Sequence, residues 1–446
     1  MTNLANELGT EKISKLLIKQ AVPASIGILV MSLNMIIDTI FVGQWIGSLA
    51  IAAITVVLPI VFLISSIGMG IGIGGSSIIS RALGAKNADK AFLTFGNQIS
   101  MTMALSVFFV IIGTLFCSSL LLLFGANGDI LVPATEYFHV VLYGVPFLAF
   151  AMMGNPVIRA EGKPKFAMYA MIIPAFTNIV LDVIFIKFLG WGMFGAGLAT
   201  SLSYAACGLF IFGFFLSKKS ALIINPKYFI LNLPIVKEIV QLGGVTIVRQ
   251  GTISILMIVL NGTLFKYGGE NAIAVYGIIN RVMMFALFPV LGVTQGFLPI
   301  AGYNYGAKDS KRVKETIKTA IIYGTGVATV IFLGIIIFPT AIASIFTNDA
   351  NLIAETPSAL LYAFLATPVI TTQLVGAAYF QAAGKALPAL LLTLLKQGIF
   401  LIPLVYIMPQ FFGLNGVWLS FPIADIMATS ITFIFLQREV KKSLSS

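Results

Sequence analysis

Long apolar runs dominate the pattern of hydrophobic and polar positions along this chain. A membrane-spanning helix needs about 20 mainly apolar residues. Runs such as 105–123 are apolar on every face, whereas the strands of a membrane barrel alternate over about ten residues. The pattern therefore predicts an all-α integral membrane protein with twelve transmembrane helices, at 16–43, 49–80, 91–124, 131–160, 165–189, 194–217, 235–266, 271–302, 313–346, 352–383, 387–411 and 415–437.

The composition agrees with this pattern and excludes other classes of protein. Of the 446 residues, 59% are hydrophobic and 10% are charged, whereas a soluble domain carries about 25% charged residues. A soluble enzyme, a nucleic-acid binder and a disordered protein are therefore excluded. Cys117 and Cys207 lie inside apolar runs, so no disulfide framework is expected. The single histidine, His139, argues against a histidine-based metal site or catalytic triad.

The basic residues predict the orientation in the membrane. With both termini in the cytoplasm, 22 of the 27 Lys and Arg residues fall in cytoplasmic segments, and the outside loops hold only Lys187 and Lys266. Cytoplasmic loops of membrane proteins carry such an excess. It accounts for the net charge of +11 without a nucleic-acid partner. We expect a multi-pass protein of the plasma or inner membrane, in contact with lipids and without a removable signal peptide.

The two halves of the chain share short motifs at a nearly constant offset. The offset is 222 residues for Gly84-Ala85-Lys86 and Gly306-Ala307-Lys308, Gly162-Lys163 and Gly384-Lys385, Phe124 and Phe346, and Pro146 and Pro368, and it is 221 for Gly192 and Gly413. Six spans in each half make the repeats parallel, related by an axis along the membrane normal. We expect an N-lobe at 1–217, a cytoplasmic linker at 218–234 and a C-lobe at 235–446, which suits alternating access.

Two carboxylates lie well inside the predicted spans of the N-lobe, although ionisable groups are costly there. Asp38 and Asp182 lie at matched depth in the outer half of helices 1 and 5. Asn178 shares a helix face with Asp182 at i, i+4, and Thr200 of helix 6 reaches a similar depth. Such an oxygen-rich cluster can bind a proton or a hard cation such as Na⁺. The alternative is that each carboxylate is a structural hydrogen-bond acceptor.

The C-lobe does not duplicate this cluster, because the positions 222 residues beyond Asp38 and Asp182 are Leu260 and Leu404. Its charged residues inside the spans are instead Arg249, Arg281, Lys396 and Asp425. One interpretation is that these residues contact substrate or form charge pairs that rearrange between conformations. The other is that they form a static salt-bridge network. The expected pair is Lys396 with Asp425. In helix 1, Pro23 removes a backbone hydrogen bond and permits bending. The glycine run 68–75 predicts close helix packing.

Four motifs together resemble those of the MATE (multidrug and toxic compound extrusion) family, over essentially the whole chain. They are Arg81-Ala-Leu-Gly84-Ala-Lys, Arg159-Ala-Glu-Gly162-Lys-Pro164, Asn178-Ile-Val-Leu-Asp182 and Gly302-Tyr-Asn304-Tyr-Gly306-Ala. The sequence resembles the branch of MepA-like exporters and DinF-like proteins. The NorM-like branch has carboxylates in helices 7, 8 and 10, where this chain has Arg249, Arg281 and the neutral segment 371–373. A NorM-type ion site is therefore not expected in the C-lobe.

The resemblance implies roles for residues in both lobes. The implied cation-coupling residues are Asp38, Asn155, Asn178, Asp182 and Thr200, of which Asp38, Asn178, Asp182 and Thr200 would hold the metal ion if Na⁺ is coupled. The residues assigned to the substrate cavity or its gating are Pro23, Tyr137, Met171, Arg249, Arg281, Lys396 and Asp425.

The expected function is secondary active multidrug efflux by H⁺ or Na⁺ antiport. The substrates would be amphipathic, cationic organic compounds, and the transporter would be a monomer without a cofactor. No ATP-binding motif is present, so the energy must come from an ion gradient. The alternative is a lipid-linked precursor flippase, since Arg249, Arg281 and Lys396 suit phosphates, but that class usually carries additional helices. An enzyme is not expected, because neither a nucleophile–base pair nor a His/Glu metal motif appears.

Overall fold

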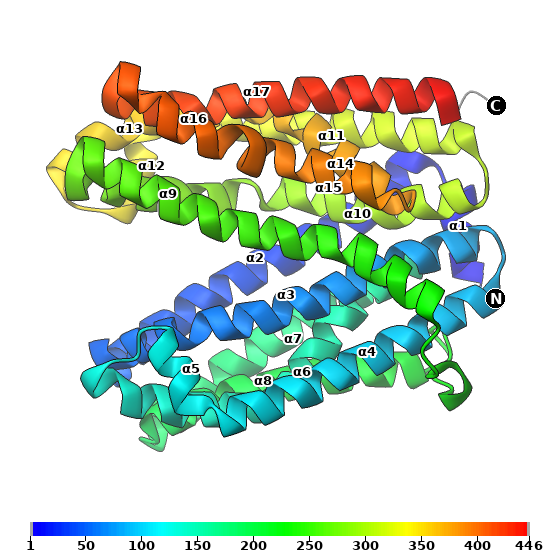
Figure 1. Ribbon diagram of the computed structural model, residues 1–446, viewed down its shortest axis with the longest axis horizontal. Coiled ribbons are helices and arrows are strands. Elements are labelled where there is room, and N and C mark those ends of the chain that lie inside the picture. The colour runs from blue at the N-terminus through cyan, green and yellow to red at the C-terminus, as the bar shows by residue number, and fades with distance from the viewer. Residues whose placement is uncertain (1–2, 444–446) are drawn as a thin grey trace. The chain divides into compact units, whose positions relative to one another are not determined.

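The computed structural model describes residues 3–443, which are helical apart from short connections and contain no β-strand (Figure 1). The α-helices are α1 (Asn3–Thr10), α2 (Ile13–Trp45), α3 (Ser48–Gly84), α4 (Ala88–Leu115), α5 (Cys117–Leu123), α6 (Leu131–Ala160), α7 (Pro164–Asp182), α8 (Gly192–Leu216), α9 (Leu233–Ala286), α10 (Phe288–Gly306), α11 (Ser310–Ile337), α12 (Pro339–Phe346), α13 (Ala350–Phe364), α14 (Ile370–Ala382), α15 (Ala386–Leu394), α16 (Ile402–Ile407) and α17 (Pro409–Ser443). Short 3₁₀ turns cover Gly128–Ile130, Pro226–Tyr228 and Thr367–Val369, and π-helical segments cover Val183–Phe188 and Leu395–Leu401.

These helices provide the twelve predicted membrane crossings. Within the described residues, 11 helical segments are long and apolar enough to cross a membrane, and one of them, Leu233–Gly306, has 74 residues. A helix of that length would extend about 110 Å, far more than the ~30 Å hydrocarbon core. Gly269 interrupts it with non-helical backbone angles, φ 65° and ψ −158°, so two crossings meet there. The expected twelve-helix fold is confirmed.

The backbone confirms the repeat at the offset predicted from the motifs. A residue with positive φ directly after a helix terminates that helix by a left-handed turn. Such residues occur in two matching pairs, Lys86 and Lys308 at φ 58° and 60°, and Gly162 and Gly384 at 76° and 80°. A third pair with positive φ consists of Gly192 at the start of α8 and Gly413 inside α17, at 53° and 57°. The halves therefore share turn geometry as well as sequence motifs.

The described residues form two compact units whose boundaries fall inside helices. The first unit contains the described residues up to Leu8 together with Ile26–Thr246, and the second contains Gly9–Ser25 and the described residues from Ile247 onward. Helix α2 thus begins in the second unit and continues in the first, whereas α9 begins in the first and continues in the second. The first crossing of each half is shared between units in the same way.

Glycines let these helix beginnings approach their neighbours closely, as the glycine run predicted. In the first unit, a Cβ atom on Gly74 would lie 2.3 Å from the carbonyl oxygen of Ile239, and one on Gly243 would lie 2.3 Å from that of Gly70. In the second unit, a Cβ atom on Gly296 would lie 2.8 Å from the amide nitrogen of Ala21. Larger side chains at these positions would force the helices apart.

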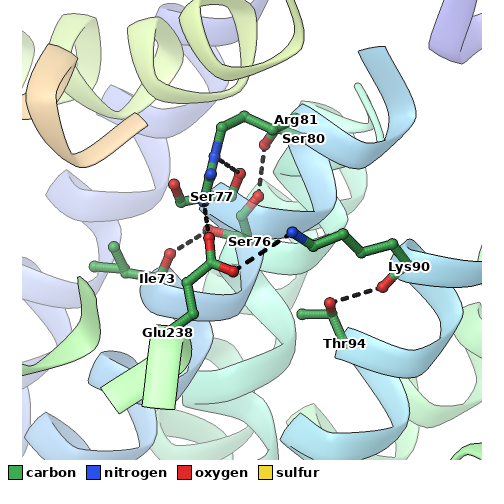
Figure 2. Close-up of polar contacts among 8 residues, drawn as sticks. All are labelled: Ile73, Ser76, Ser77, Ser80, Arg81, Lys90, Thr94 and Glu238. Carbon is green, nitrogen blue, oxygen red and sulfur yellow. Dashed lines mark hydrogen bonds and ion pairs between the residues drawn. The ribbon is translucent and has the colours of Figure 1, made fainter. Parts of the chain in front are cut away.

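An ion-pair cluster fixes the beginning of α9 within the first unit. Figure 2 shows the Glu238 carboxylate between two basic side chains. It lies 2.8 Å from Nη2 of Arg81 on α3 and 3.5 Å from Nζ of Lys90 on α4. Arg81 also donates a hydrogen bond from Nε to the carbonyl oxygen of Ser77. The cluster ties the ends of three helices at the predicted cytoplasmic side.

A buried carboxyl group holds the segment that connects the halves. Glu161, in the turn between α6 and α7, is 1% exposed. It accepts hydrogen bonds from the Ser220 hydroxyl, at 2.9 and 3.1 Å, and from the Ala221 N–H at 2.7 Å. Burial away from water raises the pKa of Glu161 to about 7.

We predict that Gly162→Ala and Gly384→Ala each lower the melting temperature of the purified protein by about 1–2 °C. An alanine in the left-handed region costs about 1–2 kcal/mol, and both glycines have φ near that region, at 76° and 80°. Gly213→Ala is the matched control, since this α8 glycine has nothing within 4 Å of an added Cβ atom. If Gly213→Ala melted at as low a temperature as the two turn variants, the left-handed backbone of Gly162 and Gly384 would not be the cause of their effect.

We predict that Glu161→Gln changes the pH dependence of stability. The pKa of Glu161 is raised in the folded protein from its usual 4.5 to about 7. The contribution of Glu161 to the stability of the folded state therefore falls as the pH rises through that interval, and it no longer changes with pH above it. The difference in melting temperature between variant and wild type should favour the variant at pH 8 more than at pH 5. The exposed Glu315→Gln should show equal differences at both values.

Candidate functional site

Helices α2 and α7 run side by side in parallel register, and this register brings the two predicted carboxyl groups together. The Asn34 side-chain amide donates a hydrogen bond to Oδ1 of Asn178 at 3.2 Å. One turn further along both helices, Asp38 and Asp182 lie within hydrogen-bonding range of each other. The Asn34–Asn178 and Asp38–Asp182 pairs both have a sequence offset of 144 residues. Two parallel helices give such a constant offset, because both rise by the same distance per residue.

The carboxyl pair is buried in a way that requires a proton or a cation. Asp182 is 0% exposed, whereas Asp38 is half-buried. With both groups ionised, neither Asp182 oxygen receives a hydrogen bond from any described residue. Two facing carboxylates repel each other, and a buried charge without a partner is costly. A proton shared by the pair, or a bound cation, removes both penalties.

Hydroxyl groups from α6 and α8 complete the surroundings of the pair. The Tyr137 and Thr200 hydroxyl oxygens lie 3.4 Å apart, and both residues are buried. Thr200 also donates a hydrogen bond to the Ala196 carbonyl oxygen. Tyr137 and Tyr204 both lie within electrostatic range of Asp38. The structure thus brings together Asp38, Asp182, Asn178 and Thr200, as the sequence predicted. It also places Tyr137, which was assigned to the substrate cavity or its gating, beside them.

Tyr204 and Asn34 were missed by the sequence reasoning, although a shared pattern identifies them. Three helices of the first unit each carry two polar residues at i, i+4, which places both on one face. The pairs are Asn34 and Asp38 on α2, Asn178 and Asp182 on α7, and Thr200 and Tyr204 on α8.

The structure does not bring Asn155 to the carboxyl pair. Its side-chain amide donates to the Ala167 carbonyl oxygen at 2.7 Å and accepts from Nε of Arg159 at 3.1 Å. Asn155 and Tyr137 lie five turns apart on α6, about 27 Å at 1.5 Å per residue. Asn155 therefore lies toward the predicted cytoplasmic end, together with Met171, whose sulfur is 3.3 Å from Nη2 of Arg159.

Pro23 lies buried inside α2, which stays helical through it. The missing backbone N–H leaves one carbonyl without its helical partner. The boundary between the two units follows Ser25, one turn or less from the proline. The candidate bending point thus coincides with the passage of α2 from one unit to the other.

In the second unit, the expected ion pair is present and the carboxyl cluster is not duplicated. Nζ of Lys396 lies 2.6 Å from Oδ1 of Asp425, which is buried on α17. Leu260, the counterpart of Asp38, is buried in an apolar cluster. Arg281 is exposed and Arg249 is half-buried.

Both charged positions on the fifth crossing of each half lie beside a widened helical turn. The π-helical segment Val183–Phe188 directly follows Asp182, and the segment Leu395–Leu401 contains Lys396. Such segments are rare and occur often at functional sites, where they reorient side chains. No residue pattern in the sequence predicted them.

Comparison with known proteins supports a transport role. The MatE family model matches residues 23–184 and again residues 246–407. A multidrug export protein MepA of Staphylococcus saprophyticus is 30% identical over 430 residues, which cover 94% of this chain and 93% of the relative. MepA of Staphylococcus aureus is 28% identical over 428 residues, with coverage of 94% and 93%. The solved outward-facing conformation of a multidrug resistance MATE family transporter of the MOP superfamily has a TM-score of 0.93 and 28% identity, and covers 99% of this chain and 98% of its own.

We predict that Asp425→Ala and Lys396→Ala each destabilise the protein by about 3 kcal/mol, because each strands a buried charge. The double variant should lose less than the sum of the two, since it removes both charges together. Thermal unfolding of the purified variants measures this coupling. The exposed Lys318→Ala is the control, with an expected change within ~0.5 kcal/mol. Strictly additive losses would show that the contact is energetically unimportant.

Proposed function

This chain belongs to the MatE family, and on that premise we propose that it exports drug-like organic compounds in exchange for protons. Amphipathic cations are the proposed substrates, in line with relatives named multidrug export proteins. This naming favours drug export over a lipid-linked precursor flippase. The protein is a multi-pass membrane protein. The basic loops support a plasma or inner membrane location with both termini in the cytoplasm.

The observation that carries the proposal is the buried contact between Asp38 and Asp182. Two carboxyl groups in direct contact need at least one proton between them. This contact favours H⁺ over Na⁺ as the coupling ion. Asn178 and Thr200 supply neutral oxygen atoms beside the pair, and these would serve as ligands if Na⁺ binds instead.

Coupling requires that the proton and the drug favour different conformations, because a ligand that is indifferent to conformation shifts no equilibrium. Gaining a proton removes a net negative charge from the carboxyl pair. A cationic drug is attracted by the ionised pair and loses this attraction on protonation. A bend of α2 near Pro23 would carry Asp38 along α7 and so link the protonation state to the shape of the N-lobe. In the C-lobe, Lys396 and Asp425 are proposed to contact substrate.

We predict that Asp38→Asn and Asp182→Asn each reduce proton-driven export at least tenfold, with normal expression. Asparagine keeps the size and hydrogen bonding of aspartate but cannot take up and release the coupling proton. The measurement is uptake of a fluorescent organic cation into everted vesicles, with H⁺ and Na⁺ gradients imposed separately. Wild-type uptake should follow the H⁺ gradient.

The matched control is Asp129→Asn, the same chemical change at an exposed position. It should export at the wild-type rate. If both site variants also exported at that rate, the carboxyl pair would be structural. If wild-type uptake followed only the Na⁺ gradient, the coupling ion at this site would be Na⁺ and the proposal of proton coupling would be wrong.

A further inference from the structure

The segment that connects the two halves runs along α4, and that helix satisfies its backbone hydrogen bonds. The carbonyl groups of residues 228–230 all accept from α4 side chains: the Asn97 amide donates to the first and third at 3.3 and 3.2 Å, and the Ser100 hydroxyl donates to the second at 2.7 Å. The Asn97 side-chain oxygen accepts from the Asn232 N–H at 2.7 Å. Protein groups thus replace water along this backbone, as an apolar environment requires.

This contact lies at a depth where α4 is expected to begin to face lipid. Asn97 and Ser100 lie nine and twelve residues beyond the first residue of α4, about 14 and 18 Å at 1.5 Å per residue. Helix α4 has no exposed residue from Ala91 to Thr102, and its exposed apolar side chains begin at Met103, less than one turn beyond Ser100. The connecting segment therefore covers α4 directly beside the beginning of its lipid-facing surface.

Four exposed side chains of the segment are apolar. Ile230 and Leu233 are each 78% exposed, and Ile223 and Leu231 are also more than half exposed. Apolar side chains are unfavourable in water, and interfacial segments bury them at the boundary between the lipid headgroups and the acyl chains. The surface that these four residues form therefore fits the edge of the hydrocarbon core better than the cytoplasm.

The charges of the segment complement an anionic surface. Residues 217–237 contain no acidic residue and four lysines, which are Lys218, Lys219, Lys227 and Lys237. All four are exposed, and no carboxylate of the described residues forms an ion pair with them. Nζ of Lys219 lies instead 5.2 Å from the centroid of the Phe166 ring, and Nζ of Lys227 lies 5.9 Å from that of Tyr228. Lysines beside apolar side chains keep their charge at the polar boundary, where the phosphate groups of anionic lipids attract it.

We propose that the connecting segment is an interfacial anchor that binds anionic phospholipids. Its four apolar side chains insert among the acyl chains of the nearer leaflet, and its four lysines bind the lipid phosphate groups. Glu161 holds the first part of the anchor against the protein, and Asn97 holds the last part. Because α9 begins at Leu233, the anchor fixes the depth at which this helix enters the membrane. This role is independent of the drug export proposed above.

Insertion is tested by the quenching of a fluorescent label on the full chain, reconstituted in liposomes of lipids with brominated acyl chains. The label is attached at Ile230→Cys, since Cys117 and Cys207 are buried and stay unlabelled. It should be quenched at least threefold more than a label at Lys311→Cys, because acyl chains surround the first label and water surrounds the second. Lys311 is the control because it is exposed in the first turn of α11. Equal quenching at the two positions would overturn the insertion.

Headgroup selection is tested with the Ile230→Cys label in equimolar phosphatidylcholine and phosphatidylglycerol, of which one at a time is brominated. Brominated phosphatidylglycerol should quench at least twofold more than brominated phosphatidylcholine, because the lysines gather anionic lipid around the segment. Replacing all four lysines of the segment with glutamine should reduce this ratio to about one, since no charge then distinguishes the two lipids. The matched control makes the same change at four other exposed lysines and should keep the ratio; these are Lys308, Lys311, Lys314 and Lys318. A ratio of one without these replacements, or an equal loss in the control, would overturn lipid binding by the segment.

Discussion

The parallel register of α2 against α7 is the constraint on which the candidate site depends. It places Asn34 on Asn178 and Asp38 on Asp182 with one constant offset. A shift of either helix by one residue would rotate these side chains by about 100° and separate every pair at once. Two carboxyl groups are thereby held in contact where water cannot solvate both. The proton or cation binding that we propose for this pair would thus be a consequence of helix packing.

The two halves use one backbone plan for different chemistry. Matching turns at Lys86 and Lys308 show that the helices end at equivalent places. Nevertheless, Leu260 lies in an apolar cluster at the position equivalent to Asp38. Buried charge in the second unit is instead neutralised within the protein, by the contact of Lys396 with Asp425. The first unit therefore carries the pair that we propose exchanges an ion, whereas Lys396 and Asp425 in the second unit neutralise each other.

Much of the fold was predictable from the sequence because a membrane crossing needs a long apolar run and the motifs recur at a fixed offset. The carboxyl pair and the Lys396–Asp425 contact were also predictable, since intramembrane charges are few and must find partners. The resemblance wrongly grouped Asn155 with the pair, because it transfers residue identity without depth; the 18 residues that separate Asn155 from Tyr137 in one span already indicate a different depth. The π-helical turns beside Asp182 and Lys396 depend on tertiary packing. The division of α2 and α9 between units has the same origin, and no local residue pattern encodes it.

That division has a consequence for the order in which the protein can be completed during synthesis. The surface of α3 around Gly70 and Gly74 is covered by the beginning of α9. The ribosome makes that segment only after all six crossings of the first half and the connecting loop. The beginning of α2 must wait longer, until Gly296 of α10 has been made. Neither half can therefore reach its final packing alone, and a gene divided at the connecting loop would yield two fragments that each lack a helix beginning.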